Sequence, residues 1–581
     1  MAVRRGVWVV IVLIVIAVFV SAMGMLLLVS TVGREPQVAS GSTLVLRVGG
    51  DLAEMEPGGV FGPFLEAQPT VRSITEMLRT AKADRRITSV IIKPTGPAAM
   101  WGKVQEVRDA ITDFRRSGKP IVAYLEYGGE QEFYLASACD KVFLMPAASL
   151  DLTGMASYEL FLRGTLDKIG AFPDALHIGE YKTAANTFTE KTMTPAHREM
   201  AVSLNTDLYE QLVRGIAEGR RKSEAEVRSL IDHGPFLPED ALRAGLIDDL
   251  AYEDELDDKV KLAPGTVRYV DMNQYRHVSA SGGGFGRAPR VAIIYAAGII
   301  TSGKSSYDSP AGAVVGSDTI VEYLRKARGD SAVKAIVLRV DSPGGSAIAS
   351  DIIWREVVLT RNQKPVIASM SDVAASGGYY IAMPAHAIVA EPSTLTGSIG
   401  VVLTKFVIKG TLEKLGINME PVSRGRYAEM YSPIKAFTPE ERTRMLENMQ
   451  ATYDTFVEKA AQGRNTTPEK IDAIGQGRVW TGRQAKEIGL VDELGGLDRA
   501  VALAKQRAKI AQDADVELVI YPPKKGFFEL VADPLGATDG ATRLASRFGF
   551  GNPKVVQALA APLQVFRRGE PLALMPNVFV R

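Results

Sequence analysis

Short apolar runs of the kind found in buried strands alternate along this chain with longer stretches in which apolar residues recur at helical spacing. Residues 43–48 (TLVLRV), 89–93 (SVIIK), 335–339 (AIVLR) and 365–370 (PVIASM) are the clearest strand patterns. Strands of buried type that alternate with helical stretches predict α/β units packed around largely parallel strands.

The same succession of segments occurs twice. Leu78-Arg79 and Asp84 match Leu324-Arg325 and Asp330, and the later matches keep nearly the same offset: residues 119–123 with 364–368, 153–154 with 396–397, and 194–195 with 438–439. A register that holds over such a length predicts a tandem duplication. We expect a first repeat at residues 43–278, a flexible Gly/Ser linker at 279–287 and a second repeat at 288–520. Residues 521–581 form a C-terminal tail with apolar clusters, for which a packing or subunit-contact role is the plain interpretation.

The amino terminus carries a long apolar segment. Residues 6–29 (GVWVVIVLIVIAVFVSAMGMLLLV) are almost continuously apolar and follow Arg4 and Arg5. About 20 such residues span a bilayer, and preceding arginines favour a cytoplasmic amino terminus. The pattern predicts cytoplasmic residues 1–5, a single-pass anchor at 6–29, a linker at 30–42 and an extracytoplasmic body. The alternative is a long cleaved signal peptide, which also exports the body.

Composition narrows the class of protein. Hydrophobic residues make up 46% of the 581 residues, charged residues make up 23%, and the net charge is +1. These values are ordinary for globular domains, and without a basic block we expect no nucleic-acid partner. The single cysteine excludes an internal disulfide, and the five histidines are scattered. We therefore expect no metal site and no cofactor.

Ser376 is the candidate nucleophile. It lies in residues 371–380 (SDVAASGGYY), between a strand-like run and a helix-like run, and Gly377 directly follows it. Taken alone, this stretch is an ordinary strand-to-helix turn. The repeat comparison adds weight, because residues 342–345 (SPGG) and Ser376 of the second repeat stand opposite residues 96–99 (GPAA) and Gln131 of the first.

Lys182 shows the opposite pattern. It lies in residues 179–184 (GEYKTA), and the second repeat has Ala428 at the matching position. A serine hydroxyl needs a base, and a buried lysine that is neutral can be that base. An exposed lysine in a turn is the plain alternative. Complementary losses in the two repeats predict one composite site that both halves build.

A serine nucleophile that forms a tetrahedral intermediate also needs donors for the oxyanion and a group that orients the base. Gly344 or Gly345, after a strand, and Gly377, next to the nucleophile, can supply backbone N–H groups. Ser398 can hold the lysine amine in line. The plain alternatives are a simple turn at residues 342–345 and turn capping by Ser398.

Four motifs carry a resemblance to a known family: GEYKTA at 179–184, SPGG at 342–345, AASGGYY at 374–380 and PSTLTGSIG at 392–400. In this order and spacing the chain resembles the signal peptide peptidase A (protease IV) family, the long duplicated form of serine peptidase family S49, over about residues 6–510. Thr183 and residues 186–187 depart mildly from its pattern.

The resemblance implies tandem Clp protease/crotonase-like domains. It implies Ser376 as nucleophile, Lys182 as general base, Ser398 as the partner of the lysine, and amides near Gly344, Gly345 and Gly377 as the oxyanion hole. It also implies a homotetramer on the extracytoplasmic surface of the inner membrane that degrades released signal peptides. We expect an apolar groove in which an extended peptide pairs with strand edges.

Three other interpretations stay open. Residues 298–305 (GIITSGKS) match a nucleotide-binding P-loop, but residues that break helices follow, so we expect no nucleotide. An acyl-CoA enzyme of the crotonase type would share the fold, although a CoA substrate does not suit an exported chain. A catalytically silent membrane scaffold would not need Ser376 and Lys182.

Overall fold

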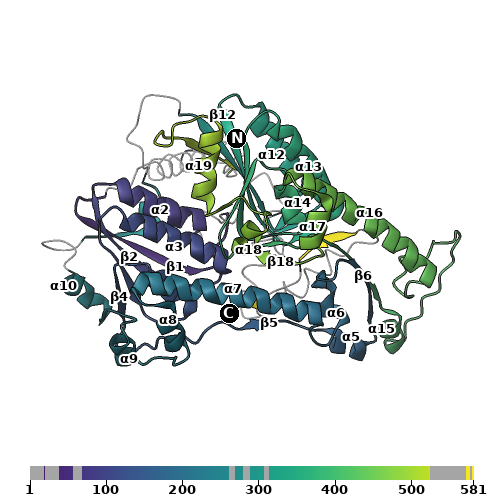
Figure 1. Ribbon diagram of the computed structural model, residues 1–581, viewed down its shortest axis with the longest axis horizontal. Coiled ribbons are helices and arrows are strands. Elements are labelled where there is room, and N and C mark those ends of the chain that lie inside the picture. Colours follow the sequence, from purple (N-terminus) through teal and green to yellow (C-terminus); the bar gives the residue numbers. More distant parts are fainter. Residues whose placement is uncertain are drawn as a thin grey trace, which may run out of the picture.

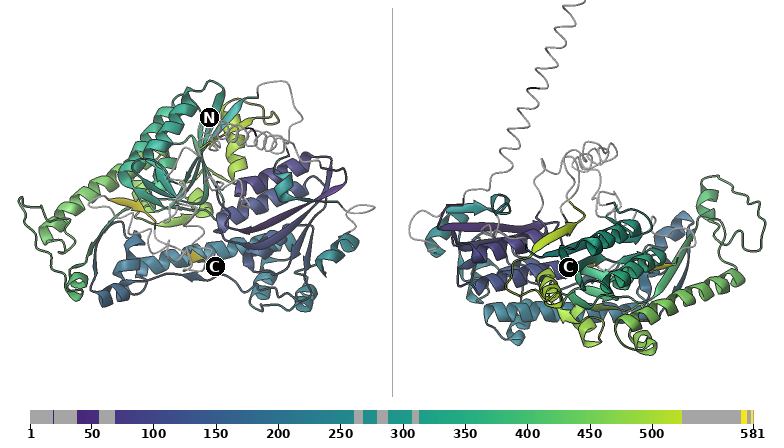
Figure 2. Two further views of the ribbon diagram at one scale, coloured as in Figure 1. Left: turned by 180° about the vertical axis from the view of Figure 1, so that it is seen from behind. Right: turned by 90° about the horizontal axis from the view of Figure 1, so that it is seen from above.

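A computed structural model describes residues 38–55, 69–260, 268–278, 288–306, 313–523, 571–575 and 579–580, together with Phe19. Figure 1 shows the first repeat, in purple and blue, beside the second, in teal and green, and both views of Figure 2 show the same arrangement. Each repeat has its own large apolar core. The mixed α/β class predicted from the sequence is confirmed.

The first repeat is built on a six-stranded sheet whose neighbouring strands all run parallel. The strand patterns at residues 43–48 and 89–93 fall on two of these strands, and most of their apolar side chains are buried because helices cover the sheet. In sheet order the strands are β7 (Asp249–Leu250), β4 (Lys141–Leu144), β3 (Ile121–Leu125), β2 (Ile87–Pro97), β1 (Ser42–Gly50) and β8 (Arg268–Asp271).

The helices of the first repeat pack on this sheet or extend from it. The longest, α7, begins at Pro195 after Thr194, whose hydroxyl accepts a hydrogen bond from the His197 amide as an N-cap. Figure 1 shows α7 running below both repeats, and it contacts elements of each. The helices are α2 (Val71–Ala83), α3 (Trp101–Arg115), α4 (Glu130–Ala136), α5 (Arg163–Ile169), α6 (Asn186–Thr189), α7 (Pro195–Arg220), α8 (Glu224–Ile231), α9 (Pro238–Arg243), α10 (Leu256–Val260) and α11 (Met272–Tyr275), with short turns η2 (Thr183–Ala185) and η3 (Glu253–Glu255).

The second repeat repeats this plan around a larger sheet. Its central strands are parallel, and one edge strand, β18, is antiparallel. The strands are β18 (Val479–Thr481), β16 (Leu395–Gly397), β14 (Val366–Ala375), β12 (Val333–Ser342), β9 (Arg290–Ala297) and β20 (Glu517–Tyr521), with β15 (Ala387–Ala390) and β19 (Glu493–Leu494) beside β14.

The helices of the second repeat follow the order of the first. The long α16 begins at Pro439 after the N-cap Thr438, which reproduces the start of α7 and agrees with the sequence match between the two Thr-Pro pairs. The helices are α12 (Ser317–Gly329), α13 (Ala347–Arg361), α14 (Gly377–Ala382), α15 (Lys409–Lys414), α16 (Pro439–Gly463), α17 (Pro468–Ile474), α18 (Gly482–Glu487) and α19 (Leu497–Arg507).

A third sheet joins the two repeats. Strand β6 of the first repeat pairs antiparallel with β17 of the second, from Val401↔Ile178 to Val407↔Phe172. The turn after β6 therefore lies against the second repeat. In sheet order the strands are β11 (Val314–Gly316), β10 (Ile299–Thr301), β13 (Gly344–Ser346), β21 (Leu572–Leu574), β17 (Val401–Val407) and β6 (Phe172–Ile178); a separate pair joins β22 (Phe579–Val580) to β5 (Ser157–Tyr158).

Buried polar contacts also hold the repeats together. The guanidinium of Arg339 binds the carboxylates of Glu54 and Glu106 at 2.8 and 2.6 Å. The Asp372 carboxylate accepts a hydrogen bond of 2.8 Å from the backbone amide of Lys103, in the first turn of α3. Buried ion pairs add little net stability, and these contacts link residues of the two repeats in one defined geometry.

Several sequence predictions fall wholly or partly outside this description, among them residues 1–5, most of the linker at 30–42 and most of the tail at 521–581. The predicted anchor, residues 6–29, lies outside the described residues apart from Phe19, and the linker at 279–287 lies outside them entirely. In the ranges that are described, none of the helices has both the length and the apolar character required to cross a bilayer. The P-loop-like residues 298–305 contain strand β10, and the next helix, α12, begins only at Ser317.

Candidate active site

The fold brings together three side chains that lie far apart in the sequence. The Nζ atom of Lys182 is 2.7 Å from Oγ of Ser376, 3.0 Å from Oγ of Ser398 and 2.9 Å from the carbonyl oxygen of Ser398. Lys182 comes from the first repeat and both serines from the second. The composite arrangement that the complementary losses predicted is thus present in a single chain.

Ser376 stands at the junction of β14 and α14. Its backbone has φ 53° and ψ −112°, a strained conformation for a residue with a side chain, and it is the N-cap of α14. Its amide donates a 2.7 Å hydrogen bond to the carbonyl of Gly397, and its carbonyl accepts the first helical bond, from Tyr380. These bonds hold the hydroxyl at the positive end of a helix.

Lys182 is held by a tight turn that follows β6. Its amide donates to the carbonyl of Gly179 at 3.1 Å, and the amide of Tyr181 donates to Gln476 at 2.7 Å. Gly477 packs directly on this turn: a Cβ there would come within 2.6 Å of both Cα and Cβ of Lys182. The loop at Gln476 and Gly477 therefore sets the position of the lysine.

The lysine stem meets a second glycine. A Cβ on Gly400 would lie 3.0 Å from Cδ of Lys182. Gly400 is the last residue of the motif at 392–400, which assigns it no role, and Gly477 lies outside all four motifs. The repeat pattern alone could not identify either one, because the need for glycine arises from a side chain in the other repeat.

Burial lowers the pKa of the Lys182 amine. Lys182 is 1% exposed and Ser376 is 0% exposed. In the described part of the chain, the polar atoms within hydrogen-bonding distance of Nζ belong to Ser376 and Ser398, which carry no charge. Desolvation by this burial holds the pKa of Lys182 well below its ordinary value of 10.5. The amine is therefore suited to accept a proton near neutral pH.

Ser398 contacts the amine through two of its oxygen atoms. It follows β16 with φ 53°, and its own amide donates to the carbonyl of Arg478 at 2.7 Å. The carbonyl and hydroxyl oxygens of Ser398 accept hydrogen bonds from both N–H groups of a neutral lysine amine. The remaining lone pair then accepts the hydroxyl proton of Ser376, which satisfies all three positions on the nitrogen.

The three predicted oxyanion glycines lie together. A Cβ on Gly377 would be 3.1 Å from Cα of Gly344 and 3.2 Å from the amide nitrogen of Gly345. Gly344 and Gly345 have φ of 103° and 151°, which residues with side chains rarely adopt. The Gly344 amide donates to Oγ of Ser342 at 3.2 Å. The amides of Gly345 and Gly377 are therefore the better candidates for an oxyanion.

The first repeat has replaced this arrangement. Gln131, which the repeat comparison sets opposite Ser376, donates its side-chain amide to the carbonyl of Ala99 at 3.0 Å. Ala99 stands in the segment that matches Ser-Pro-Gly-Gly. The side chain of Gln131 thus binds the backbone that matches residues 342–345, and the first repeat contributes Lys182 to the contact with Ser376 instead.

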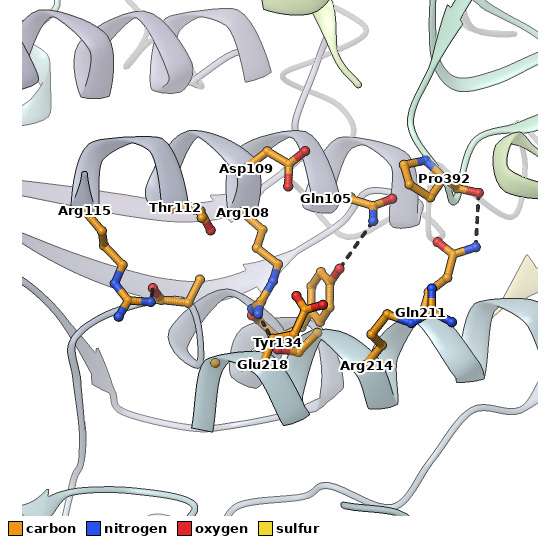
Figure 3. A pocket seen from close by; sticks show the side chains of 13 residues that line it. Gln105, Arg108, Asp109, Thr112, Arg115, Tyr134, Gln211, Arg214, Glu218 and Pro392 are labelled. Carbon is orange, nitrogen blue, oxygen red and sulfur yellow. Dashed lines mark hydrogen bonds between the residues drawn. The ribbon is translucent and has the colours of Figure 1, made fainter. Parts of the chain in front are cut away.

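A cavity of about 410 Å³ lies elsewhere, mainly between α3 and α7. Figure 3 shows Arg108, Tyr134 and Gln211 among its lining side chains, with Pro392 reaching it from the second repeat. Gln211 donates to the carbonyl of Pro392 at 3.1 Å. Neither Ser376 nor Lys182 lines this cavity, so it is separate from the candidate active site.

Comparison with known proteins agrees with the duplication. The sequence profile of Peptidase family S49 matches residues 113–264 and again residues 359–511. The chain is 38% identical to "Serine protease SPPA, chloroplastic" of Arabidopsis thaliana, over 77% of this chain and 67% of that one. It is 33% identical to "Protease 4" of Salmonella typhi, over 84% of this chain and 78% of that one. It is also 36% identical, over 25% of this chain and 42% of the other, to "Putative signal peptide peptidase SppA" of Enterococcus faecium. The matched segments and these relatives show that the chain belongs to peptidase family S49, a family of serine peptidases.

Proposed function

We propose that the protein is a membrane-anchored endopeptidase with a Ser376–Lys182 dyad that degrades cleaved signal peptides and other apolar peptides at the extracytoplasmic membrane surface. One observation carries the proposal. A lysine amine whose pKa is lowered by burial lies 2.7 Å from a serine hydroxyl at the start of a helix. Such a pair meets the requirement of an activated nucleophile without a histidine.

The geometry supports a two-step acyl transfer. Nζ of Lys182 accepts the hydroxyl proton of Ser376 as Oγ attacks the peptide carbonyl carbon. The oxyanion that forms accepts hydrogen bonds from the backbone amides of Gly345 and Gly377. The lysine ammonium then gives its proton to the leaving amine as the C–N bond breaks. Water repeats the sequence on the acyl-serine, with Lys182 as base, and releases the acid. Ser398 holds the amine in line throughout.

The substrate and setting belong to the same proposal. Apolar side chains line the third sheet near the dyad, among them Ala184 and Val402, and suit apolar peptides. The Enterococcus faecium relative is named as a putative signal peptide peptidase, which supports signal peptides as substrates. The Clp protease/crotonase-like class of the repeats, the anchor at residues 6–29, the homotetramer and the periplasmic location all come from the sequence, and we retain them as proposals.

The experiment is hydrolysis of a synthetic signal peptide in detergent by wild type, Ser376→Ala and Lys182→Ala. Lys334→Ala, at an exposed lysine that donates to the carbonyl of Ser331, serves as a matched control. We expect both dyad variants to lose at least about 1,000-fold in kcat with the fold retained. Full activity in Lys182→Ala near neutral pH would mean that another group is the base.

A further inference from the structure

A strand from the segment predicted as an unassigned tail lies inside the third sheet. Strand β21 pairs antiparallel with β13, with Gly344↔Leu574, Gly345↔Ala573 and Ser346↔Leu572 opposite each other. The pairing extends beyond the strand, since the amide of Met575 donates to the carbonyl of Pro343 at 2.8 Å. The strand that carries the oxyanion glycines is thus already paired with residues of the same chain.

The other edge of β21 faces β17. Leu572 is the antiparallel partner of Val402, and in the sheet order β21 is the strand that separates β13 from β17. Neighbouring strands lie about 4.8 Å apart, so β13 and β17 are separated by about 10 Å, the width of a single extended chain. Without β21, a slot for one extended peptide would lie between them.

This slot adjoins both members of the dyad. Strand β17 begins three residues after Ser398, and its other neighbour, β6, leads to the turn that carries Lys182. Helix α14, which follows Ser376, also contacts β21. A peptide bound in the slot would therefore run past the nucleophile.

The side chains of the segment fill apolar sites beside the dyad. Leu572 is 1% exposed and packs with Ala184, Ala185 and Val402. Met575 is 6% exposed and packs in a cluster that includes Ala375, the residue before Ser376, and borders Tyr181, the residue before Lys182. The cluster contains Met200, Leu204, Val373, Ala375, Leu395, Val479 and Met575.

The backbone fit is equally close. A Cβ on Gly344 would overlap the carbonyl oxygen of Ala573, and the same Cβ would lie 2.7 Å from the amide nitrogen of Gly377. The chain of β21 therefore passes directly over the oxyanion glycines. Ser376 and Lys182 are both buried while it is there.

We propose that residues 571–575 are a built-in competitive inhibitor, which binds as an extended strand in the peptide-binding slot between β13 and β17 and must leave before a substrate can bind. The inference rests on the proposed function, because it takes the slot to be the substrate site. An extended peptide that adds a strand to an open sheet edge is a common mode of peptide recognition. The apolar sequence PLALM has the character expected of the proposed substrates.

The first test measures binding without catalysis. In a Ser376→Ala background, a fluorescein-labelled PLALM peptide is titrated and its anisotropy followed. The double substitution Leu572→Asp/Met575→Asp places carboxylates in two apolar sites and should release the segment. The apparent affinity for the peptide is proportional to the fraction of protein whose site is open. We therefore expect the double variant to bind the peptide at least about tenfold more tightly than its parent. Each single substitution is measured too, in case the double variant does not fold. Either one should raise the affinity for the peptide, by less than the double substitution.

The second test measures turnover in the chain with Ser376 intact. We expect the double substitution to raise kcat/KM for a signal peptide by about tenfold. Free PLALM should then inhibit this variant competitively and wild type only weakly. Val422→Asp, at a fully exposed apolar position, is the matched control and should change neither binding nor turnover.

The outcomes separate the two proposals. Tighter peptide binding without any hydrolysis would support the built-in inhibitor and contradict the peptidase function. Hydrolysis by wild type with unchanged binding and turnover in all three tail variants would overturn the inhibitor and leave the peptidase intact. A chain that mass spectrometry finds cut within residues 571–575 during turnover would also overturn it, because the segment would then be a substrate.

Discussion

Replacing Gly477 by alanine should greatly lower the activity of the enzyme, although neither Ser376 nor Lys182 is substituted. Gly477 lies in the second repeat with φ 79°, and a Cβ there would stand 2.6 Å from Cα and Cβ of Lys182. Carbon atoms in ordinary contact are about 3.5–4.0 Å apart, so the loop and the lysine turn must separate by about 1 Å. The lysine backbone is clamped by its bond to Gly179, so that shift moves its amine relative to Ser376.

The size of the effect follows from this displacement. A misplacement of about 1 Å in a catalytic group lowers the rate by about 100-fold, which corresponds to about 2.7 kcal/mol in the activation barrier. The positive φ adds about 1–2 kcal/mol of strain to the folded state of the variant. We expect KM to change little, because the slot between β13 and β17 is not altered directly.

Gly489 offers a matched control. It has φ 82°, and a Cβ there would meet nothing within 4 Å. Gly489→Ala should therefore lose the same conformational stability as Gly477→Ala but keep wild-type kcat. The assay is kcat and KM for a signal peptide at neutral pH, with thermal unfolding of both variants. A folded Gly477→Ala enzyme with kcat within about threefold of wild type would refute the claim that this loop positions the base.

Three further changes test other parts of the site. Lys182→Met should abolish activity and raise the melting temperature at pH 7. Because the pKa of Lys182 is lowered in the folded chain, the folded chain binds fewer protons than the unfolded chain. The stability of the wild type therefore rises with pH toward the ordinary lysine pKa of 10.5. The methionine variant should lack that rise when thermal unfolding is compared at pH 7 and 9. Ser398→Ala removes one hydrogen bond to the amine and leaves the carbonyl contact, so we expect kcat to fall about tenfold, while an unchanged kcat would exclude an orienting role for the hydroxyl. Asp372→Ala removes the buried cap of α3 across the repeat junction and should cost about 2 kcal/mol in urea unfolding, whereas Asp513→Ala, at an exposed aspartate, should cost nothing measurable.

Ser376 and Lys182 could be predicted as a pair because the two repeats differ at these positions. Ser376 and Lys182 each survive in one copy only, and the structure places them 2.7 Å apart. Ser398 could be predicted from its place in the motif at residues 392–400. The parallel strands followed from apolar runs that repeat along the chain, since burial on both faces leaves a signal that is local in sequence.

Other features had no local signal. The insertion of β21 depends on pairing with strands far away in the sequence, and an apolar run such as residues 571–575 is equally compatible with packing anywhere. Gly477 is required by the backbone of Lys182, which belongs to the other repeat. The pairing of β6 with β17 likewise joins segments from both halves, and only three-dimensional structure reveals it.

The most direct test of the dyad is the rate at which a serine-reactive fluorophosphonate modifies Ser376 as pH is varied, with the modified residue identified by mass spectrometry. We expect modification at Ser376 alone, with a rate that rises with pH around a midpoint below 10.5 as Lys182 loses its proton, and no modification in Lys182→Met. An equal rate in Lys182→Met, or labelling of another serine in the wild-type protein, would contradict it.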